Sequence, residues 1–399
     1  MSRCYIRGIY FHLIFGDTLC VSFVVYIFRC LLPILQESLI LNLLNCVWDY
    51  QNKLIMTGSI IVTYRCPMRC KMCNIWENPT KPSEEFAPEL LKKLPRMNGV
   101  NITGGEPFVR EDIEDIVKVL ETKTERIVFS TSGYFSDRIL EMARKHPHVG
   151  YRISIEGLSC KNDELRGRQG GFDKGLHTLL ELRRMGIKDI GFGITVSNNN
   201  SADMLNLYEL SKNLKMQFAT ASFHNSFYFH KYDNKVTNLD EVCGNFDELI
   251  QRLMQENDPK SWFRAFFNLG LINYVKGGRR MLPCEAGTEN FFIDPVGNVL
   301  PCNGMEENCW FDTMGNLNDV SSFEEIWQSE KAAQVREKVA NCPKSCWMIG
   351  SVSPVMKKYI RQVIPWVIKN KWKVVRGETV DTECIPFFHV GNNDKQGLR

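Results

Sequence analysis

The chain has 399 residues, of which 44% are hydrophobic and 24% are charged, so it is long enough for two or three folded domains. Its 49 basic and 46 acidic residues nearly cancel, which excludes binding driven by a global excess of positive charge, and we predict no nucleic-acid partner. The 15 cysteines fall in clusters. In a reducing cytosol clustered thiols bind metal more often than they pair, so we predict a cytoplasmic metal-binding protein.

The first stretch of the chain, residues 1–55, differs from the rest. Residues 9–35 are mostly apolar, but Asp17 and Pro33 interrupt a run that would otherwise suit a membrane span. No small-residue cleavage site follows, as a secretory signal would require. We favour the interpretation that translation begins at Met56. A membrane anchor, with peripheral or N-terminal membrane association, and a folded N-terminal element are the alternatives.

Regular alternation begins after Met56. Short runs rich in β-branched and aromatic residues alternate with helical patterns such as residues 111–123 and 171–186. Strands that alternate with helices predict βαβ units and a parallel sheet, and six such units make a partial (β/α)6 TIM-like barrel of the α/β class. The predicted strands span residues 59–64, 99–103, 126–131, 150–155, 189–196 and 217–222.

Three segments follow the predicted barrel, which we assign to residues 56–235. Residues 236–281 are predicted to form a helical connector, and residues 282–350 a small cysteine-bearing domain. The tail, residues 351–399, is basic and interleaves lysines with tryptophans. This composition suits a helix on a membrane surface or a helix packed on the protein with solvated lysines, and we favour the second.

The first cysteine cluster stands directly after the first predicted strand. The run "RCPMRCKMC" places Cys66, Cys70 and Cys73 in a CxxxCxxC spacing. Three thiolates on one short loop can hold three irons of a four-iron cluster and leave the fourth iron open to a substrate. A zinc site would need four closed ligands, and no fourth Cys or His lies nearby in the sequence. The pattern therefore predicts an iron–sulfur cluster with chemistry beyond electron storage.

This loop, together with "ITGGEP" at the end of the second predicted strand, resembles the radical S-adenosylmethionine (SAM) enzymes over about residues 56–235. The resemblance implies that the three cysteines are catalytic and that GGEP binds the amino group of SAM, because exposed carbonyls and a carboxylate suit an ammonium group. Glu156 replaces the usual Asp of the fourth-strand motif, and Arg166 is expected to pair with the SAM carboxylate. The implied SAM contacts are Gly104, Gly105, Glu106, Pro107, Thr131, Ser132, Ser154 and Arg166.

A second set of cysteines lies near the C-terminal end: Cys284, Cys302, Cys342 and Cys346. Four thiolates complete the coordination of one [4Fe–4S] cluster, and a zinc site is the alternative. The C-x12-G-x4-C start resembles the SPASM extension of radical SAM enzymes. The chain lacks the C-x2-C-x5 element of a full SPASM domain, so we expect one auxiliary [4Fe–4S] cluster, as in the shorter twitch form. Cys309 is either a further ligand or a free thiol.

The loop after the sixth predicted strand is rich in histidine and tyrosine. Loops at the carboxyl ends of barrel strands carry the substrate sites of such folds. Two interpretations stand, a substrate pocket or a purely structural aromatic loop. The residues concerned are His224, Asn225, Tyr228, His230 and Tyr232.

The resemblance implies an enzyme that reductively cleaves SAM to a 5′-deoxyadenosyl radical, which abstracts hydrogen from a substrate C–H bond. The implied cofactors are SAM, the SAM-binding [4Fe–4S] cluster and the auxiliary cluster, which would accept an electron or position the substrate. An electron donor such as flavodoxin or ferredoxin and a peptide or small-molecule substrate are the expected partners. Within the family there are two alternative activities: a maturase of ribosomal peptides, and a sugar or cyclitol dehydrogenase. A non-catalytic iron–sulfur or zinc scaffold is the alternative outside it.

Overall fold

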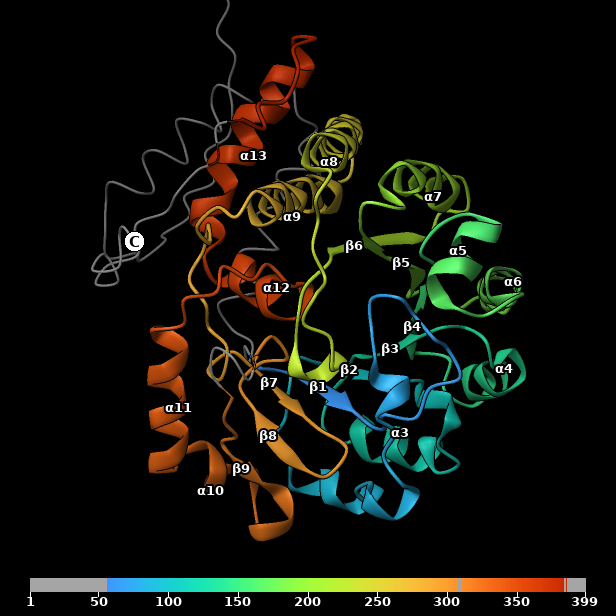
Figure 1. Ribbon diagram of the computed structural model, residues 1–399, viewed down its shortest axis with the longest axis vertical. Helices are drawn as coiled ribbons and strands as arrows, with labels where there is room; N and C mark the ends of the chain where they lie inside the picture. The colour runs from blue at the N-terminus through green and yellow to red at the C-terminus, as the bar shows by residue number, and fades with distance from the viewer. Residues whose placement is uncertain (1–55, 307–310, 384, 386–399) are drawn as a thin grey trace, which may run out of the picture. The chain divides into compact units, whose positions relative to one another are not determined.

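The computed structural model of the chain describes residues 56–306, 311–383 and 385. There, nine strands form one open sheet in the order β6-β5-β4-β3-β2-β1-β7-β8-β9 (Figure 1). Neighbours from β6 to β7 pair in parallel, and β8 pairs antiparallel with both β7 and β9. The strands are β1 Thr57–Ile61, β2 Gly99–Thr103, β3 Ile127–Thr131, β4 Gly150–Ser154, β5 Ile190–Val196, β6 Gln217–Ser222, β7 Asn290–Ile293, β8 Asn298–Leu300 and β9 Gly315–Asn316.

Helices α3 to α7 alternate with the parallel strands and lie along one face of them (Figure 1). Two long helices, α8 and α9, then pack against each other; α9 also packs against β6 at the end of the sheet, and α8 packs against α7. The helices are α3 Ile113–Glu121, α4 Ser136–Lys145, α5 Ser159–Arg166, α6 Gly171–Arg184, α7 Ser201–Asn213, α8 Leu239–Gln255, α9 Pro259–Val275, α10 Phe323–Trp327, α11 Glu330–Ala340, α12 Ile349–Lys358 and α13 Ile360–Val375.

The six predicted strands are confirmed as β1 to β6, and the predicted ranges of β2 and β6 coincide with the observed ones. The first strand differs, because β1 spans Thr57–Ile61 rather than residues 59–64. The sheet bonding continues only to Val62, whose N–H donates to the carbonyl of Thr103 at 2.8 Å. The Thr63 hydroxyl instead donates to the carboxylate of Glu85, whose side chain has an exposed fraction of 3%. The chain therefore leaves the sheet early and turns toward the cysteines.

The centre of the sheet is apolar because helices and loops cover it. Ile60, Ile102, Phe129 and Tyr151 occupy one row of register across β1 to β4, and each has an exposed fraction of 0%. The rings of Phe129 and Tyr151 are stacked with centroids 5.8 Å apart. Strands of a parallel sheet are buried on both faces, which explains their nearly continuous apolar runs.

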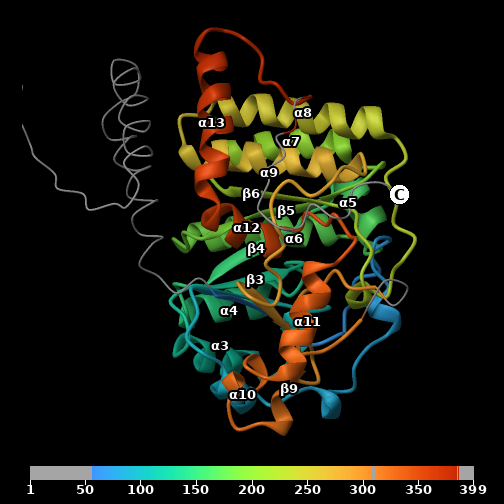
Figure 2. The ribbon, with the colours of Figure 1, turned by 90° about the vertical axis from the view of Figure 1, so that its left-hand side faces the viewer.

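The C-terminal cysteine-bearing segment extends the same sheet. β7 pairs in parallel with β1, with Thr57 opposite Asn290 and Ile60 opposite Ile293, and β8 and β9 follow as an antiparallel extension. Helices α10 and α11 lie beyond these strands (Figure 2). The segment that carries the second set of cysteines is thus joined to the barrel by the backbone hydrogen bonds of β7.

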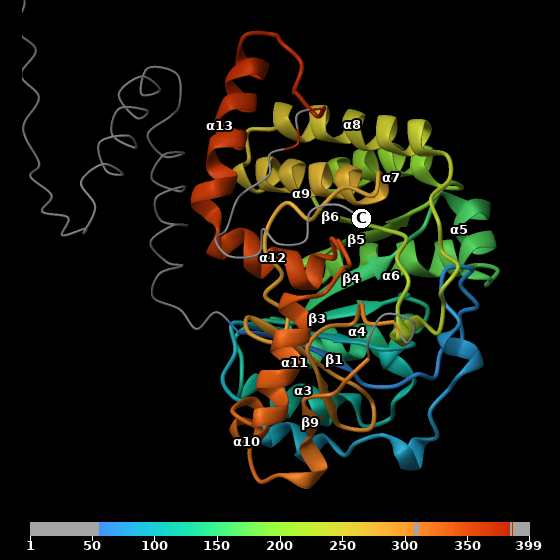
Figure 3. The same cartoon turned by 60° about the vertical axis from the view of Figure 1, so that its left-hand side comes forward.

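The last two helices pack on the protein. Figure 3 shows α12 between α11 and α13, and α13 lies across one end of α8 and α9. Trp366 of α13 is buried, with its ring centroid 5.6 Å from that of Phe266 in α9, as the packed-helix interpretation of the tail predicts. Across the part of the chain that is described, no helix has both the length and the apolar character needed to cross a membrane. The predicted N-terminal extension, residues 1–55, and Cys309 lie outside the described residues.

Candidate active site

The loop that carries Cys66, Cys70 and Cys73 is braced by the end of α5. The N–H of Arg69 donates to the carbonyl of Arg166, and that of Lys71 to the carbonyl of Leu165, each at 2.9 Å. The α5 helix ends at Gly167, whose φ of +60° lies in the left-handed region. A Cβ at Gly167 would stand 2.3 Å from the Arg69 carbonyl oxygen, so only glycine lets the helix end approach the loop so closely.

The three thiols lie close enough to influence one another. Burial raises the pKa of all three, that of Cys73 to about 12, and the Arg166 guanidinium acts in the opposite direction on each. Cys70 acts on Cys66 and on Cys73 as a neighbouring negative charge. A thiol must lose its proton to bind iron, so metal binding would convert this neutral set into thiolates, and the adjacent guanidinium favours that charge. The donor set fits a cluster held by three cysteines.

The predicted GGEP motif lies directly against this loop. The N–H of Gly105 donates to the Thr63 carbonyl at 2.7 Å, and that of Glu106 to the Arg65 carbonyl at 2.9 Å. A Cβ at Gly105 would stand 2.3 Å from the Arg65 carbonyl oxygen and 2.9 Å from Cβ of Cys66. The second glycine is therefore required for the two loops to meet. The structure brings the GGEP residues and the first cysteine together.

Glu106 joins the second strand to the third. It has an exposed fraction of 0%, and its carboxylate accepts hydrogen bonds from the Thr131 hydroxyl at 2.6 Å and the Ser132 N–H at 2.8 Å. The Ser132 hydroxyl and the Phe108 N–H are further donors. Pro107 opens the 3-10 turn Pro107–Val109 that follows. Glu106 thus orders the predicted SAM contacts around it, and its own contact with the SAM ammonium stays a prediction.

Arg166 is the buried cation of the site. Its Nη1 donates to the Glu156 carboxylate at 3.1 Å, and its Nε is buried without a hydrogen-bond partner among the described residues. Glu156 also accepts from the Thr195 N–H at 2.6 Å, although burial raises its pKa. An unsatisfied guanidinium N–H beside the cysteine loop fits an anionic ligand such as a carboxylate. Ser154 is half-buried at the carboxyl end of β4.

A buried carboxylate that sequence reasoning missed also holds the cysteine loop. Glu85 accepts a bidentate pair from Arg65, with Nη2 at 2.7 Å, and a hydrogen bond from the Thr80 hydroxyl at 2.7 Å. Arg110 lies behind it, with its guanidinium 4.0 Å from the same carboxylate. Glu85 stands in a polar stretch of the sequence, which gives no signal that it is buried.

The loop after β6 connects the first cysteine loop to the C-terminal segment. The Asn74 N–H donates to the Phe229 carbonyl, and the Phe227 N–H to the Met305 carbonyl, each at 2.8 Å. Between them, the Tyr228 hydroxyl donates to the Gly104 carbonyl at 2.6 Å. The sequence pointed to this loop as a candidate substrate site, but it gave no sign of the hydrogen bond between Tyr228 and Gly104 of the GGEP motif. The loop is therefore structural in its backbone, while Tyr228 reaches the candidate SAM site.

His224 of the same loop is half-buried, and its Nδ1 lies 3.2 Å from the Ser222 carbonyl oxygen. Burial lowers the pKa of His224 to about 4, so the imidazole is neutral at pH 7. Its Nε2 has no hydrogen-bond partner among the described residues.

The four C-terminal cysteines also come together. Burial is the main cause that raises the pKa of Cys302. The negative charge of the neighbouring Cys284 is the next, and those of Cys342 and Cys346 add to the rise. Lys344 donates to the Gly304 carbonyl at 2.6 Å and anchors the second half of the set. In the residues that the structure describes, no three His, Cys, Asp or Glu side chains are spaced to share a single metal ion. Four mutually influencing thiols fit the wider donor set of a four-iron cluster.

One apolar cluster contacts both sets of cysteines. Cys66 and Cys73 pack against it from the first set and Cys302 packs against it from the second. Its buried members are Ile61, Ile75, Phe227, Tyr228, Phe292, Leu300 and Met305. The two sets thus share one buried apolar neighbour that includes aromatic rings.

An open α/β barrel with a three-cysteine loop at its strand ends defines an iron–sulfur protein of the α/β class. In comparison with known proteins, residues 60–210 match the model of the radical SAM superfamily, and residues 284–348 match that of SPASM, an iron–sulfur cluster-binding domain. The chain thus contains a radical SAM region followed by a SPASM domain, and these two domains imply SAM, a SAM-binding [4Fe–4S] cluster and an auxiliary iron–sulfur cluster as cofactors.

Individual relatives agree with this assignment. The Fe-coproporphyrin III synthase of Methanosarcina barkeri is 30% identical over 39% of this chain and 40% of its own length. The mycofactocin maturase MftC of Mycolicibacterium smegmatis is 26% identical over 69% of this chain and 71% of its own. The matched region thus spans less than half of the first relative.

Solved structures share the fold. Streptococcus suis SuiB superposes with a TM-score of 0.54 at 17% identity, over 70% of this chain and 67% of that one. The enzyme anSMEcpe, solved with bound AdoMet and a peptide, gives a TM-score of 0.54 at 13% identity, over 80% of this chain and 99% of that one. At these identities the likeness concerns the fold alone.

Proposed function

We propose that the chain is a peptide maturase that abstracts hydrogen from a C–H bond of its substrate and carries one auxiliary [4Fe–4S] cluster on Cys284, Cys302, Cys342 and Cys346. The observation that carries the proposal is the apolar cluster shared by the two sets of cysteines. A substrate held there would face the first set on one side and Cys302 on the other. This placement suits a substrate that loses a hydrogen atom at one site and an electron at the other.

When bound, the SAM-binding cluster and SAM supply a 5′-deoxyadenosyl radical that removes the hydrogen atom. The chain's own residues orient SAM and exclude water. Arg166 offers an unpaired N–H to the SAM carboxylate, and the GGEP loop, where the ammonium is expected, lies against the cysteine loop at Gly105. Tyr228 and Glu106 fix the GGEP loop through their hydrogen bonds. Burial of these groups protects a reactive species from solvent.

Several relatives support a peptide as the substrate. MftC is described as a maturase, SkfB of Bacillus subtilis as a sporulation killing factor maturation protein, and SuiB was solved bound to its precursor peptide SuiA. Other relatives act on different molecules, as the name GTP 3′,8-cyclase shows. A sugar or cyclitol dehydrogenase is therefore the second candidate, because the matched barrel is common to relatives with unlike substrates.

The proposal also includes a cytoplasmic location and a protein electron donor. All nine described cysteines are free thiols, which suits the reducing cytoplasm where such clusters are loaded. A flavodoxin or ferredoxin would supply the electron that SAM cleavage consumes.

The test is hydrogen abstraction from a peptide. The reconstituted full chain is incubated without oxygen with SAM, dithionite and short peptides translated from the reading frames beside its gene. We expect 5′-deoxyadenosine to form faster with one peptide, and mass spectrometry to show that this peptide has lost hydrogen. Replacing Cys66, Cys70 and Cys73 by alanine should abolish both signals. Stimulation by sugars or cyclitols and by none of the peptides would contradict the peptide assignment, while no 5′-deoxyadenosine at all would contradict the enzyme.

A further inference from the structure

Three exposed cations stand beside the first cysteine loop. Arg69 and Arg168 line an open cleft of about 450 Å³ together with Tyr134, Gly167 and Gln169. Lys174 lies at the same place, with its Nζ 4.2 Å from the centroid of the Tyr134 ring. We call Arg69, Arg168 and Lys174 the cationic rim. Among the described residues, none of the three forms an ion pair, whereas the neighbouring Lys71 pairs with Glu164 at 2.6 Å.

The cationic rim is held in place by aromatic rings rather than by carboxylates. The Arg168 guanidinium lies 4.7 Å from the Tyr134 ring centroid, and its Nη2 donates to the Tyr134 hydroxyl at 2.9 Å. The Arg69 guanidinium lies 5.4 Å from the ring centroid of Trp76. The hydrogen bond from Arg168 lowers the pKa of Tyr134, and the charge of Lys174 acts in the same direction. Cation–π contacts order the charges without neutralising them.

The rim adjoins the first cysteine loop, because Arg69 belongs to that loop and also lines the cleft. Arg69 and Lys71 flank Cys70 in the chain, and both are exposed. Cys70 is influenced by Arg166 and Glu156, whereas Cys66 and Cys73 pack on the apolar cluster shared with Cys302. The rim residues are not part of that apolar cluster. The cationic rim therefore offers a route to the first site that does not pass between the two sets of cysteines.

We propose that the cationic rim is the docking surface for an acidic one-electron donor protein of the flavodoxin or ferredoxin type. The proposal rests on the proposed function in that the three cysteines hold a redox cluster. In the step, the reduced donor loses one electron, the cluster gains it, and no bond is made or broken. Complementary charge steers such partners and sets their orientation. An acidic segment of the substrate is the less suitable occupant, because the substrate has to reach the space between the two sets of cysteines.

The test reverses the charge of the rim in the full chain. The variant Arg69→Glu/Arg168→Glu/Lys174→Glu is reconstituted, and reduction of its oxidised clusters by flavodoxin hydroquinone is followed by stopped-flow absorbance. We expect the second-order rate constant at low ionic strength to fall by about tenfold or more, and the difference from wild type to shrink as salt is added. Formation of 5′-deoxyadenosine with dithionite should be unchanged in Arg168→Glu/Lys174→Glu, which leaves the cysteine loop intact, because this small reductant needs no docking surface.

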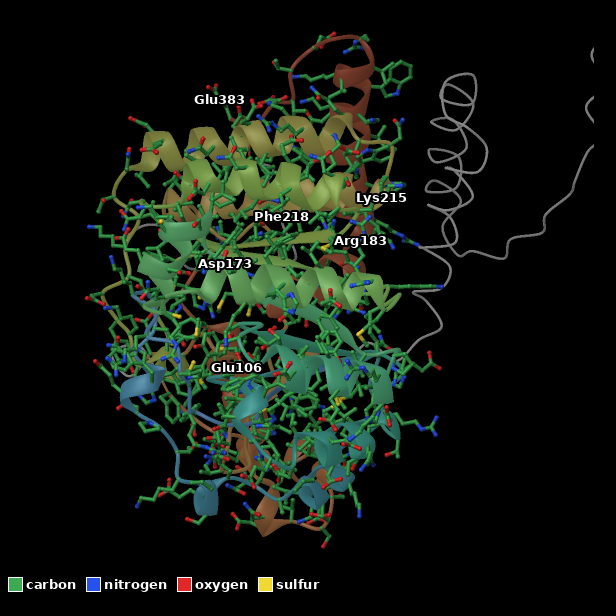
Figure 4. All side chains as sticks on the ribbon, turned by 90° about the vertical axis from the view of Figure 1, so that its right-hand side faces the viewer. Glu106, Asp173, Arg183, Lys215, Phe218 and Glu383 are labelled. Carbon is green, nitrogen blue, oxygen red and sulfur yellow. The ribbon has the colours of Figure 1, made fainter. Side chains whose placement is uncertain are left out.

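A matched control carries the same change of charge elsewhere. Arg183→Glu/Lys188→Glu/Lys215→Glu alters three exposed cations, and Figure 4 shows Arg183 at the opposite end of α6 from Asp173, the neighbour of Lys174. This control should be reduced by flavodoxin within about twofold of wild type if local rather than net charge decides the rate. Because Arg69 lies inside the cysteine loop, the double variant Arg168→Glu/Lys174→Glu is measured beside the triple. It leaves that loop unaltered and should show most of the effect.

Each outcome of these measurements supports or overturns the assignment of the rim as a docking surface. Equal rates with flavodoxin for the rim variants and the wild type would overturn the docking surface. So would an equal loss in the matched control. If the double variant kept flavodoxin reduction but lost binding of the peptide substrate, the rim would belong to an acidic substrate segment instead. Loss of dithionite-driven 5′-deoxyadenosine in the wild type itself would contradict the proposed function rather than the docking surface.

Discussion

Glu106 forms more hydrogen bonds within the protein than a residue that only contacts a ligand would need. Its carboxylate accepts from Thr131, Ser132 and the Phe108 N–H in a fully buried position, so it connects the GGEP loop with the turn after β3. Removal of one partner from a buried hydrogen-bonded group leaves the others unsatisfied, at about 1–3 kcal/mol for each group.

We therefore predict that Glu106→Ala destabilises the fold as well as the SAM site. The free energy of unfolding should fall by about 3 kcal/mol, since the hydroxyls of Thr131 and Ser132 lose their acceptor. Urea unfolding of the full chain followed by circular dichroism measures this. The control Glu111→Ala, at an exposed position, should change it by less than about 0.5 kcal/mol. An unchanged urea midpoint and unchanged SAM affinity in Glu106→Ala would refute the anchoring role.

Tyr228 gives a finer test of the same loop. Tyr228→Phe keeps the ring in the apolar cluster but removes the hydrogen bond to the Gly104 carbonyl. A neutral hydrogen bond contributes about 0.5–1.5 kcal/mol, so we expect SAM to bind roughly two- to tenfold more weakly, with iron content unchanged. Equilibrium dialysis of the reconstituted protein measures both.

The control for this change is Tyr208→Phe in α7, which removes a hydroxyl bonded to Glu256 at the C-terminal end of α8. It should leave the SAM dissociation constant at the wild-type value. Equal weakening in both variants would show that Tyr228 has no specific effect on the SAM site.

Residue patterns predicted the cysteines and GGEP because these residues occupy fixed places after strands. They did not predict Glu85 or the hydroxyl contact of Tyr228. Both depend on approaches between segments distant in the chain, 20 residues from Glu85 to Arg65 and 124 from Tyr228 to Gly104. No local pattern encodes such a distance. The role of each SAM contact stays a prediction.

At the scale of elements, the strands were predictable and some helices were not. β2 to β6 are apolar runs of a buried parallel sheet, which local composition reveals. The α5 helix, with the sequence SCKNDELR, has no apolar stripe, and its role is to brace the cysteine loop by its last turn. Its position follows from tertiary contacts rather than from its own periodicity.

The meeting of the β1 and β2 loops gives the next prediction. Gly105→Ala would place a Cβ 2.3 Å from the Arg65 carbonyl oxygen, so the GGEP loop or the cysteine loop must move. We expect reconstituted protein to lose up to half of its iron, about four of about eight atoms, and to make no 5′-deoxyadenosine. Iron analysis and the SAM cleavage assay measure these.

A glycine with open surroundings serves as the control for this change. Gly244 lies inside α8, and a Cβ there meets no atom within 4 Å. Gly244→Ala should keep its iron and raise stability by about 0.5–1 kcal/mol, because alanine is the better helix former. If Gly105→Ala also kept all its iron and its activity, the close approach of the two loops would not be needed.

At the scale of the whole molecule, the SPASM segment is bound to the barrel by more than its cysteines. β7 continues the sheet beside β1, and Trp347, directly after Cys346, is buried with its Nε1 donating to the Phe267 carbonyl at 2.8 Å. The small cysteine-bearing domain predicted over residues 282–350 is present, but its pairing with β1 was not predicted, because pairing between residues 57–60 and 290–293 cannot be read from local composition. The consequence is that the segment should stay folded on the barrel even without a metal.

Because the segment is attached in this way, the auxiliary cluster can be removed by mutation without disturbing the first cysteine loop. In Cys342→Ala/Cys346→Ala we expect about four irons instead of about eight, with an unchanged circular dichroism spectrum, because β7 and Trp347 still hold the segment. The first cysteine loop is untouched, so slow formation of 5′-deoxyadenosine without substrate should persist while conversion of the true substrate fails. The control Cys160→Ala/Cys243→Ala removes two thiols that lie outside both sets and should keep all eight irons. A folded Cys342→Ala/Cys346→Ala protein with four irons and no 5′-deoxyadenosine would show that the second site supports SAM cleavage itself, against the division of roles proposed for the two sets of cysteines.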